Sequence, residues 1–404
     1  MSASNQLPDP GSDALEHSAR VSRHIRRRIA AAGGWIDFSD YMNLALYAPG
    51  LGYYSAGAQK FGESGDFVTA PEISPLFSAC LARAFLEVAF DGDSPPGSLP
   101  TILELGAGTG AMAAEILQTL QRLNAVPERY LIIEVSADLR ARQHRMINDR
   151  VPDLADRVSW LDEWPATPIT GVIVANEVLD ALPVTRFVIE AEKQIRVLGV
   201  EATESGFGWS RQPAARQLQE QILELASQLG TDWPVGYTSE ITPALTGFVD
   251  GLSQSLESGL ILLVDYGLPM RDYYAPERSS GTLACHYRHR MHPDPFFYPG
   301  LQDITAWVDF TRVANAADDA GLDVLGYTTQ AQFLLAGGIE QEYARRMELS
   351  GTEPDPRERI RLGAGLKTLM MPGQMGENFK VMALGRRLPG GPASICENDL
   401  LHLL

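Results

Sequence analysis

Hydrophobic and polar residues are arranged in two different patterns between residues 101 and 176. Short apolar runs are separated by longer segments in which apolar residues recur every three or four positions, as they do on one face of a helix. Four of the runs have the length of strands: TILEL (101–105), YLIIEV (130–135), VSWL (158–161) and GVIVAN (171–176). Strands that alternate with helices predict right-handed βαβ units and a mostly parallel, doubly wound sheet.

The same pattern returns later in the chain. Three more apolar runs predict strands: LILLVDYG (260–267), LDVLGY (322–327) and FKVMALGRR (379–387). Residues 303–320 predict a helix, and 330–374 predict further helices. Residues 184–258 predict a hairpin and two helical stretches, and residues 267–302 predict a loop rich in Tyr, His and Pro. Both interruptions follow strand ends, where open α/β sheets place their ligands.

The N-terminal part of the chain lacks this alternation. A helix is predicted over residues 13–32, and it carries five arginines: Arg20, Arg23, Arg26, Arg27 and Arg28. We interpret them as a solvated helix face, the alternative being a basic surface for nucleic acid or a membrane. Residues 35–73 are rich in Gly, Tyr and Pro and predict a long ordered loop. Ser74 is predicted to cap a helix that begins at Pro75 and ends near residue 90.

These patterns divide the chain into six segments, three of which form or interrupt the predicted core. The first part of the core spans 101–183 and the second part spans 259–388, with the insertion 184–258 between them as a region for substrate or partner. The remaining segments are a polar tail with its helix (1–30), an N-terminal loop and helix (31–100) and a C-terminal tail (389–404).

Composition narrows the class of protein. The chain has 404 residues, 45% of them hydrophobic, which is enough to bury a sizeable core. Its formal net charge of −18 disfavours non-specific binding to nucleic acid. Three cysteines without close pairing suit a reducing compartment, and no apolar run approaches the length of a membrane span. Since the first residues resemble neither a signal nor a transit peptide, we expect a cytoplasmic protein without membrane contact.

A glycine-rich turn follows the first predicted strand of the core. In the run ELGAGTG (104–110), glycines permit a tight turn and a close approach of a ligand to main-chain N–H groups at a helix N-terminus. The next strand is followed by Glu134, whose carboxylate can accept hydrogen bonds from both ribose hydroxyls of an adenosine. The combination predicts an adenosine-bearing cofactor, either a nicotinamide dinucleotide or S-adenosylmethionine.

The charge of Glu104 favours the second cofactor. A carboxylate inside the turn would repel a pyrophosphate, whereas S-adenosylmethionine carries a sulfonium and an ammonium group. Other acids near predicted strand ends agree with a cationic ligand: Asp66, Glu72, Glu177, Asp180 and Asp265. We therefore favour the methyl donor, with an NAD-dependent oxidoreductase as the alternative.

Several motifs in order along the chain carry a family resemblance. The runs GDFVTAPEIS (65–74), ELGAGTG (104–110), IEVSADLRARQ (133–143), ANEVLDALPV (175–184), PGLQDITAWVDF (299–310) and MGENFKVM (375–382) resemble the MidA-like S-adenosylmethionine-dependent methyltransferases. That family includes a mitochondrial complex I assembly factor that methylates an arginine of a complex I subunit. The resemblance extends from about Gly34 to Gly385.

The resemblance implies a fold and roles for particular residues. The fold is an α/β, doubly wound, seven-strand class I methyltransferase (Rossmann-like) core with inserted helical and hairpin elements. Glu104 would lie near the amino acid end of the cofactor and Glu134 would hold its ribose. The other residues implied to contact the cofactor are Gly106, Gly108, Gly110, Asn176, Asp66, Pro71 and Glu72.

If the acceptor is arginine, its guanidinium group must be oriented by carboxylates, because its pKa above about 12 leaves no free lone pair. Glu177 is the first candidate to hold it, with Asp180 on the same face if a helix follows. Asp265 is a second candidate, and His289 with His292 a third, as bases that could take the proton. Glu177 could instead cap a helix or contact the cofactor.

The sequence favours a protein or peptide-like acceptor, because the insertions are large, and does not exclude a small molecule. It lacks the Asp/Asn-Pro-Pro-aromatic turn of enzymes that methylate amino groups of bases, so nucleic acid is disfavoured as a substrate. The histidines His286, His289 and His292 do not share one helix face, so no metal is expected. A non-catalytic assembly factor that retains the cofactor fold is the remaining alternative. Nothing in the sequence indicates an oligomeric state.

Overall fold

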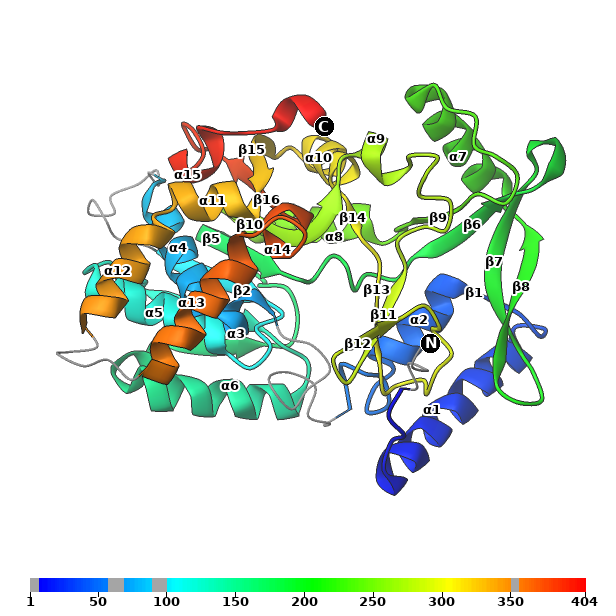
Figure 1. Cartoon of the computed structure of the whole chain (residues 1–404), viewed down its shortest axis with the longest axis horizontal. Coiled ribbons are helices and arrows are strands. Elements are labelled where there is room, and N and C mark those ends of the chain that lie inside the picture. The colour runs from blue at the N-terminus through cyan, green and yellow to red at the C-terminus, as the bar shows by residue number, and fades with distance from the viewer. Residues whose placement is uncertain (1–6, 57–68, 89–99, 350–355) are drawn as a thin grey trace. The chain divides into compact units, whose positions relative to one another are not determined.

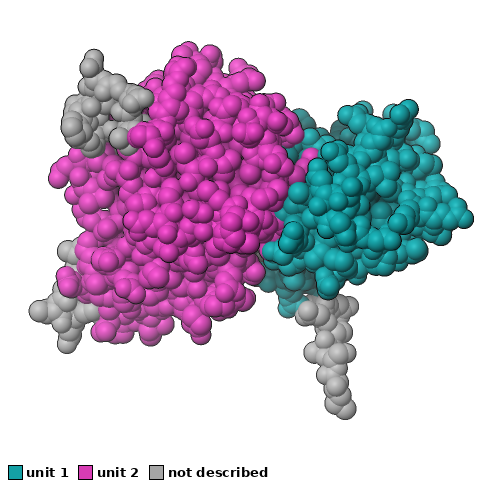
Figure 2. Space-filling view, turned by 90° about the horizontal axis from the view of Figure 1, so that it is seen from above, with its two compact units in different colours: residues 1–67, 180–245, 270–307 teal, residues 68–179, 246–269, 308–404 magenta. Residues whose placement is uncertain are grey.

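The computed structural model describes residues 7–56, 69–88, 100–349 and 356–404. The chain separates into two compact units, which Figure 2 shows in different colours. Unit 1 comprises residues 1–67, 180–245 and 270–307, and unit 2 comprises residues 68–179, 246–269 and 308–404.

Unit 2 contains a mixed sheet whose strands are ordered β15-β16-β10-β5-β2-β3-β4, with β14 paired to β10. The pairs β4–β3, β3–β2, β2–β5, β5–β10 and β10–β14 are parallel, and β16 is antiparallel to both β10 and β15. The strand bounds are β2 (Thr101–Leu105), β3 (Arg129–Ile133), β4 (Val158–Leu161), β5 (Ile169–Asn176), β10 (Leu256–Leu268), β14 (Val308–Asp309), β15 (Asp323–Thr329) and β16 (Phe379–Arg386).

Helices surround this sheet (Figure 1). Their bounds are α3 (Ala70–Ile73), α4 (Pro75–Leu86), α5 (Ala111–Arg122), α6 (Ala137–Arg150), η1 (Pro152–Arg157), α8 (Leu245–Ser255), α10 (Phe310–Asp319), α11 (Gln330–Ala336), α12 (Ile339–Leu349), α13 (Pro356–Met370), α14 (Met375–Asn378), α15 (Ala393–Cys396) and η3 (Leu401–Leu403). The helix α4 packs against both α5 and α12. Central strand residues such as Ile102, Val172 and Leu262 are fully buried in one continuous apolar core. Burial of both faces explains why these strands read as uninterrupted apolar runs in the sequence.

Unit 1 is built on an antiparallel sheet of five strands and a smaller antiparallel sheet of three. The first sheet contains β1 (Ile36–Asp37), β6 (Thr185–Ile189), β7 (Ile195–Ala202), β8 (Phe207–Pro213) and β9 (Thr238–Ile241). The second contains β11 (Ala284–Tyr287), β12 (Arg290–His292) and β13 (Asp303–Thr305). The helices are α1 (Ser12–Ala31), α2 (Phe38–Tyr47), η2 (Ala191–Lys193), α7 (Arg216–Leu229) and α9 (Met270–Tyr273).

Most sequence-predicted elements are confirmed. Every predicted core strand is present, and Ser74 caps α4 by accepting a hydrogen bond from the Leu76 N–H at 3.4 Å. The buried residues of the first helix are Ser18, Val21, Ile25 and Ile29. Four of its arginines are exposed, as predicted, whereas Arg26 is half-buried and donates a hydrogen bond to the Gly206 carbonyl at 2.9 Å. The predicted α/β class is confirmed at the level of a mixed sheet with surrounding helices.

Three predictions of local structure are wrong. Residues 267–302 were predicted to be a loop, but they contain α9 and the antiparallel pair of strands β11 and β12. Residues 35–73 were predicted to be a loop, but β1 and α2 occupy residues 36–47, because Asp37 caps the Ser39 N–H at 2.8 Å and α2 buries an apolar face. Residues 303–320 do not form one helix, since two short strands precede α10. That helix begins only after Asp309, which accepts a hydrogen bond from the Arg312 N–H at 3.2 Å.

The C-terminal segment 389–404, predicted to be a tail, forms hydrogen bonds with other parts of unit 2. The Ser394 N–H donates to the Glu87 carboxylate at 2.8 Å, and the Leu400 N–H donates to the Tyr327 carbonyl at 2.6 Å. In the part of the chain that is described, no helix combines the length and apolar character required to span a bilayer.

Candidate functional site

The glycine turn lies between β2 and α5 in unit 2, as predicted. Gly106, Gly108 and Gly110 all have positive φ, and Gly110 is the left-handed N-cap residue of α5. A Cβ added to Gly108 would meet no atom within 4 Å, so open space lies beside the main chain at this position. The turn therefore offers a ligand direct access to backbone beside a helix N-terminus.

Glu104 is fully buried at the end of β2. The Tyr130 hydroxyl donates a hydrogen bond to Glu104 Oε2 at 2.6 Å, whereas Glu104 Oε1 is buried without a hydrogen-bond partner among the described residues. Burial, together with a smaller effect of the charge of Glu134, raises the pKa of Glu104 to about 7 against the lowering effect of the Tyr130 hydrogen bond. A buried carboxylate without a cation is costly, so this group is suited to receive a positively charged ligand.

Glu134 lies just after β3 and is 7% exposed. Its Oε1 accepts a hydrogen bond from the Ser136 N–H at 2.8 Å, and its Oε2 accepts one from Gln143 Nε2 at 3.1 Å. These two bonds fix the orientation of the carboxylate at the end of the strand.

Gln143 is a residue of this site to which the sequence analysis assigned no role. It is fully buried, and its Nε2 also donates to the Gly108 carbonyl at 3.0 Å, while Trp160 Nε1 donates to its Oε1 at 2.7 Å. One amide thus connects the glycine turn, Glu134 and β4. The only signal in the sequence was a polar residue at a position of α6 where helical spacing from Leu139 and Ile147 predicts a buried side chain.

Asn176 and Glu177 follow from β5 at the same edge of the sheet. Asn176 Nδ2 donates to Glu177 Oε1 at 3.1 Å, and Asn176 Oδ1 is buried without a hydrogen-bond partner among the described residues. Glu177 has a positive φ of 54° and accepts a hydrogen bond from the Ala70 N–H at 3.3 Å, at the start of α3. Its carboxylate therefore contacts the N-terminus of α3, and not that of a helix directly after β5.

The short helix α3 carries Pro71 in its first turn together with Glu72. Glu72 Oε1 accepts a hydrogen bond from the Thr109 hydroxyl at 3.1 Å, which ties α3 to the glycine turn. Asp66, also predicted to contact the cofactor, lies outside the described residues.

Asp265 is fully buried in β10 and binds backbone. Its Oδ2 accepts hydrogen bonds from the Val178 and Leu179 N–H groups at 3.2 and 2.9 Å, and its Oδ1 accepts one from the Tyr266 N–H at 2.9 Å. The three backbone N–H groups therefore donate to the Asp265 carboxylate and not to the carbonyl groups of a helix. No helix begins directly after Glu177, so Glu177 and Asp180 do not share the face of a helix.

Two predicted catalytic residues belong to unit 1. The Asp180 carbonyl accepts a hydrogen bond from the Ala306 N–H at 2.9 Å. The Tyr54 hydroxyl donates to Asp303 Oδ1 at 2.8 Å, and its ring stacks on that of Tyr47. Burial, and after it the charges of Asp303 and Asp180, raises the pKa of both hydroxyls. His289 is exposed in the two-residue turn between β11 and β12. Among the described residues, no three His, Cys, Asp or Glu side chains are grouped as a metal site would require.

The residues of unit 2 fit an adenosine cofactor that bears a cation. The unpartnered oxygens of Glu104 and Asn176, the open space at Gly108 and the oriented carboxylate of Glu134 lie at the carboxyl ends of neighbouring parallel strands. This edge is where open α/β sheets bind their ligands.

Comparison with known proteins agrees with this geometry. Residues 80–328 match the model of a family described as S-adenosyl-L-methionine-dependent methyltransferases. The chain superimposes with a TM-score of 0.90 on a protein from Burkholderia thailandensis crystallised with S-adenosyl-homocysteine. The two share 42% identity over 99% of this chain and 100% of the other.

Relatives with assigned activities match along most of the chain. The mitochondrial protein arginine methyltransferase NDUFAF7 of Mus musculus is 29% identical over 91% of this chain and 85% of its own length. Its homologue in Drosophila melanogaster is 26% identical over 95% of this chain and 89% of its own length.

These relatives correct one prediction. The cytoplasmic localisation expected from the sequence is wrong, because the relatives are named as mitochondrial proteins. That expectation rested on cysteine usage and on the character of the first residues, neither of which records a compartment by itself. The choice of cofactor is confirmed, and with it the MidA-like resemblance. The chain belongs to a family of S-adenosylmethionine-dependent methyltransferases.

Proposed function

We propose that the chain transfers the methyl group of S-adenosylmethionine to an arginine side chain of a protein. The observation that carries this proposal is that the relatives named protein arginine methyltransferases match about nine-tenths of the chain. The size of unit 1, which lies outside the mixed sheet, agrees with an acceptor larger than a small molecule.

The cofactor would be held by the edge of the mixed sheet in unit 2. S-adenosylmethionine, when bound, supplies an electrophilic methyl group on a positively charged sulfur. Glu104 Oε1 would accept a hydrogen bond from its ammonium group, and Glu134 would accept hydrogen bonds from its ribose hydroxyls. Asn176 Oδ1 would accept a further hydrogen bond from the cofactor. Gly108 would permit contact with the main chain.

We also propose that the seven strands β4-β3-β2-β5-β10-β16-β15 form the doubly wound class I core implied by the family resemblance. The parallel order of the first five strands, with the antiparallel β16 inserted before β15, supports this assignment. β14 is then an addition at the end of β10.

For the acceptor, we propose that Glu177 orients the guanidinium group. It lies at a strand end of the cofactor edge, and its positive φ marks a strained backbone of the kind found at functional sites. Asp265 would act as a positioning residue, because its hydrogen bonds to the Val178 and Leu179 N–H groups fix the segment that carries Glu177. The other two catalytic candidates from the sequence belong to unit 1, where Asp180 is buried and His289 is exposed.

The proposal is tested by labelled methyl transfer from S-adenosylmethionine to proteins of a cell lysate, followed by acid hydrolysis and chromatography of the amino acids. We expect label in methylarginine with the wild type, and a rate at least about tenfold lower with Glu177→Gln, since a charge-assisted contact to the acceptor is lost. Binding of S-adenosyl-homocysteine should change less than the rate. Label confined to other amino acids or to small molecules would contradict arginine as the acceptor.

A further inference from the structure

A second polar pocket lies in unit 2, lined by residues of α5 and α12 and separate from the glycine turn. Its volume is about 370 Å³, and its lining residues are Glu115, Gln118, Thr119, Gln121, Arg122, Arg345 and Arg346. The turn and the pocket share helix α5. Gly110 precedes the first residue of that helix, and Arg122 is its last, about 18 Å further along at 1.5 Å per residue.

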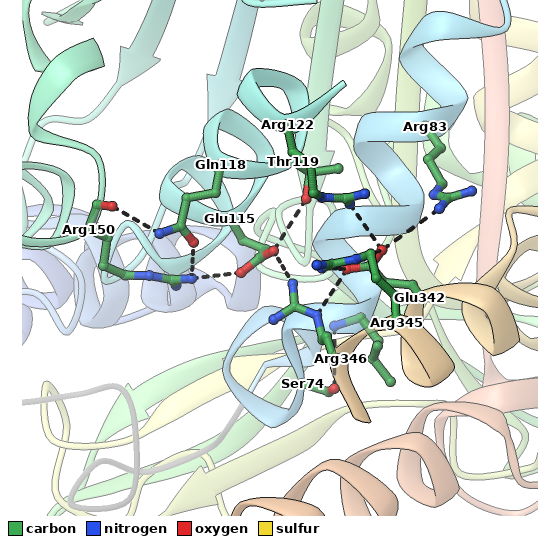
Figure 3. A network of polar contacts seen from close by, with 11 residues as sticks. Ser74, Arg83, Glu115, Gln118, Thr119, Arg122, Arg150, Glu342, Arg345 and Arg346 are labelled. Atoms are coloured by element: carbon green, nitrogen blue, oxygen red, sulfur yellow. Dashed lines mark hydrogen bonds and ion pairs between the residues drawn. The ribbon is translucent and has the colours of Figure 1, made fainter. Parts of the chain in front are cut away.

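Two buried carboxylates organise the pocket (Figure 3). The side chain of Glu342 is fully buried and contacts the guanidinium groups of four arginines: Arg83, Arg122, Arg345 and Arg346. The side chain of Glu115 is 3% exposed. It pairs with Arg150 at 2.6 Å and with Arg346, and it accepts a hydrogen bond from the Thr119 hydroxyl at 3.3 Å.

The cluster holds more positive than negative charge. Five guanidinium groups, from Arg83, Arg122, Arg150, Arg345 and Arg346, share the two carboxylates. Burial lowers the pKa of Arg122, and the neighbouring cations Arg345, Arg83 and Arg346 lower it further against the opposing effect of Glu342. Since the chain as a whole is strongly acidic, this excess is a local feature and not part of a generally basic surface.

Two arginines of the pocket lining, Arg122 and Arg345, carry N–H groups that do not contact Glu342. Their side chains remain 30% and 27% exposed, and each guanidinium carries five N–H groups. The network joins α4, α5, α6 and α12, and three of its guanidinium groups, those of Arg122, Arg345 and Arg346, line the pocket. The lining contains one carboxylate, that of Glu115, so the pocket is suited to an anion with several acceptor oxygens.

We propose that this pocket binds a small molecule that carries a phosphate or pyrophosphate group. Guanidinium groups match the geometry of phosphate oxygens with paired hydrogen bonds, and a doubly charged group would balance most of the excess charge. The volume lies in the range of small-molecule sites. A concave pocket suits such a ligand better than an acidic protein segment, which would require a more extended surface. The amides of Gln118 and Gln121 supply neutral contacts at its wall.

The test uses titration calorimetry with inorganic pyrophosphate at low ionic strength. We expect saturable binding of one pyrophosphate by the full chain, and at least about tenfold weaker binding by Arg345→Gln, which removes one charge from the pocket. The matched control is Arg216→Gln, which removes an exposed, ion-paired arginine of α7 and should leave pyrophosphate binding unchanged. Binding of S-adenosyl-homocysteine by each variant reports that its fold is intact. If Arg345→Gln fails to fold, Arg122→Gln takes its place.

Orthophosphate and citrate distinguish the chemistry of the ligand. Orthophosphate should compete with pyrophosphate and bind more weakly, because it carries fewer charges and oxygens. The proposal is overturned if the wild type shows no saturable binding, or if the folded arginine variants bind pyrophosphate as tightly as the wild type. Tighter binding of citrate or of an oligoglutamate peptide would also overturn it, and would assign the pocket to carboxylates or to an acidic protein segment.

Discussion

Glu104 and Glu342 both have fully buried side chains in unit 2, but the groups that contact them differ in charge. Glu104 has one neutral donor, the Tyr130 hydroxyl, and burial raises its pKa to about 7. Burial also acts to raise the pKa of Glu342, but hydrogen bonding from Arg345 and the charges of Arg122, Arg345 and Arg346 outweigh it and lower the pKa. One carboxylate lacks a cation, and the other has cations in excess.

This contrast shows how charge imbalance in a fold indicates a ligand. Burial alone disfavours either carboxylate, so the partners decide which state is stable. At Glu104 the missing charge agrees with the cationic cofactor of the family. At Glu342 the surplus agrees with an anion, and the arginines also join three helices far apart in the sequence. Substitutions at Glu104 and its neighbours are therefore expected to affect mainly the binding of the cofactor. Substitutions in the arginine cluster around Glu342 are expected to affect both the stability of the protein and the binding of the proposed anion.

The largest effect is expected for Glu342→Gln. Removal of this charge leaves four arginines near a neutral amide, which should lower the free energy of unfolding by about 3–5 kcal/mol. Urea denaturation measures the loss. The control Glu220→Gln breaks an exposed ion pair with Arg216 and should cost less than about 0.5 kcal/mol. Equal losses in the two variants would mean that the arginine cluster contributes no more than a surface pair.

The next effect concerns the cofactor edge. Glu134→Ala removes the carboxylate proposed to hold the ribose, and should weaken binding of S-adenosyl-homocysteine by more than about tenfold, or about 1.4 kcal/mol. Calorimetry measures the affinity. Glu190→Ala is a suitable control, because this carboxylate also accepts hydrogen bonds but lies in unit 1. Unchanged affinity in Glu134→Ala would remove the ribose assignment.

A smaller effect is expected when alanine replaces either of two glycines. It distinguishes the cost of backbone strain from the loss of space for the cofactor. Gly108 and Gly230 have similar positive φ values of 52° and 60°, and a Cβ at either would meet no atom within 4 Å. Alanine at either position should therefore cost a similar amount of stability, about 1–2 kcal/mol. Only Gly108→Ala should also weaken cofactor binding, by roughly fivefold, because its Cβ would occupy the space beside the turn. If both variants bind S-adenosyl-homocysteine as the wild type does, the cofactor does not approach this backbone.

Local sequence signals were sufficient for the core of unit 2. Buried parallel strands appear as uninterrupted apolar runs, and Ser74 indicates the start of the helix that it caps. The helix α2 was missed because the glycines and tyrosines around it have the composition of a loop, although Asp37 supplies a cap for it. Composition averaged over a long segment concealed a helix of ten residues.

The site was predictable only where chemistry and position coincide in the sequence. Glu104 and Glu134 stand directly at strand ends, so their place at one sheet edge followed from the topology. The partners of those acids, Tyr130 and Gln143, could not be assigned because a side chain's hydrogen bonds depend on tertiary packing. The arginine cluster was equally invisible, since Glu115 and Glu342 belong to helices separated by more than two hundred residues.

The proton balance of cofactor binding tests the interpretation of Glu104 most directly. At pH 7 a carboxyl group with a pKa of about 7 is half protonated, and a cationic ligand favours its ionised form. Affinity should therefore rise as pH increases through 7, and binding of S-adenosylmethionine should release roughly half a proton more from the wild type than from Glu104→Gln. Calorimetry in buffers of different ionisation enthalpy measures this difference. Equal proton release by the two proteins, or no binding by the wild type, would contradict a carboxylate at this edge that receives the positive charge of the cofactor.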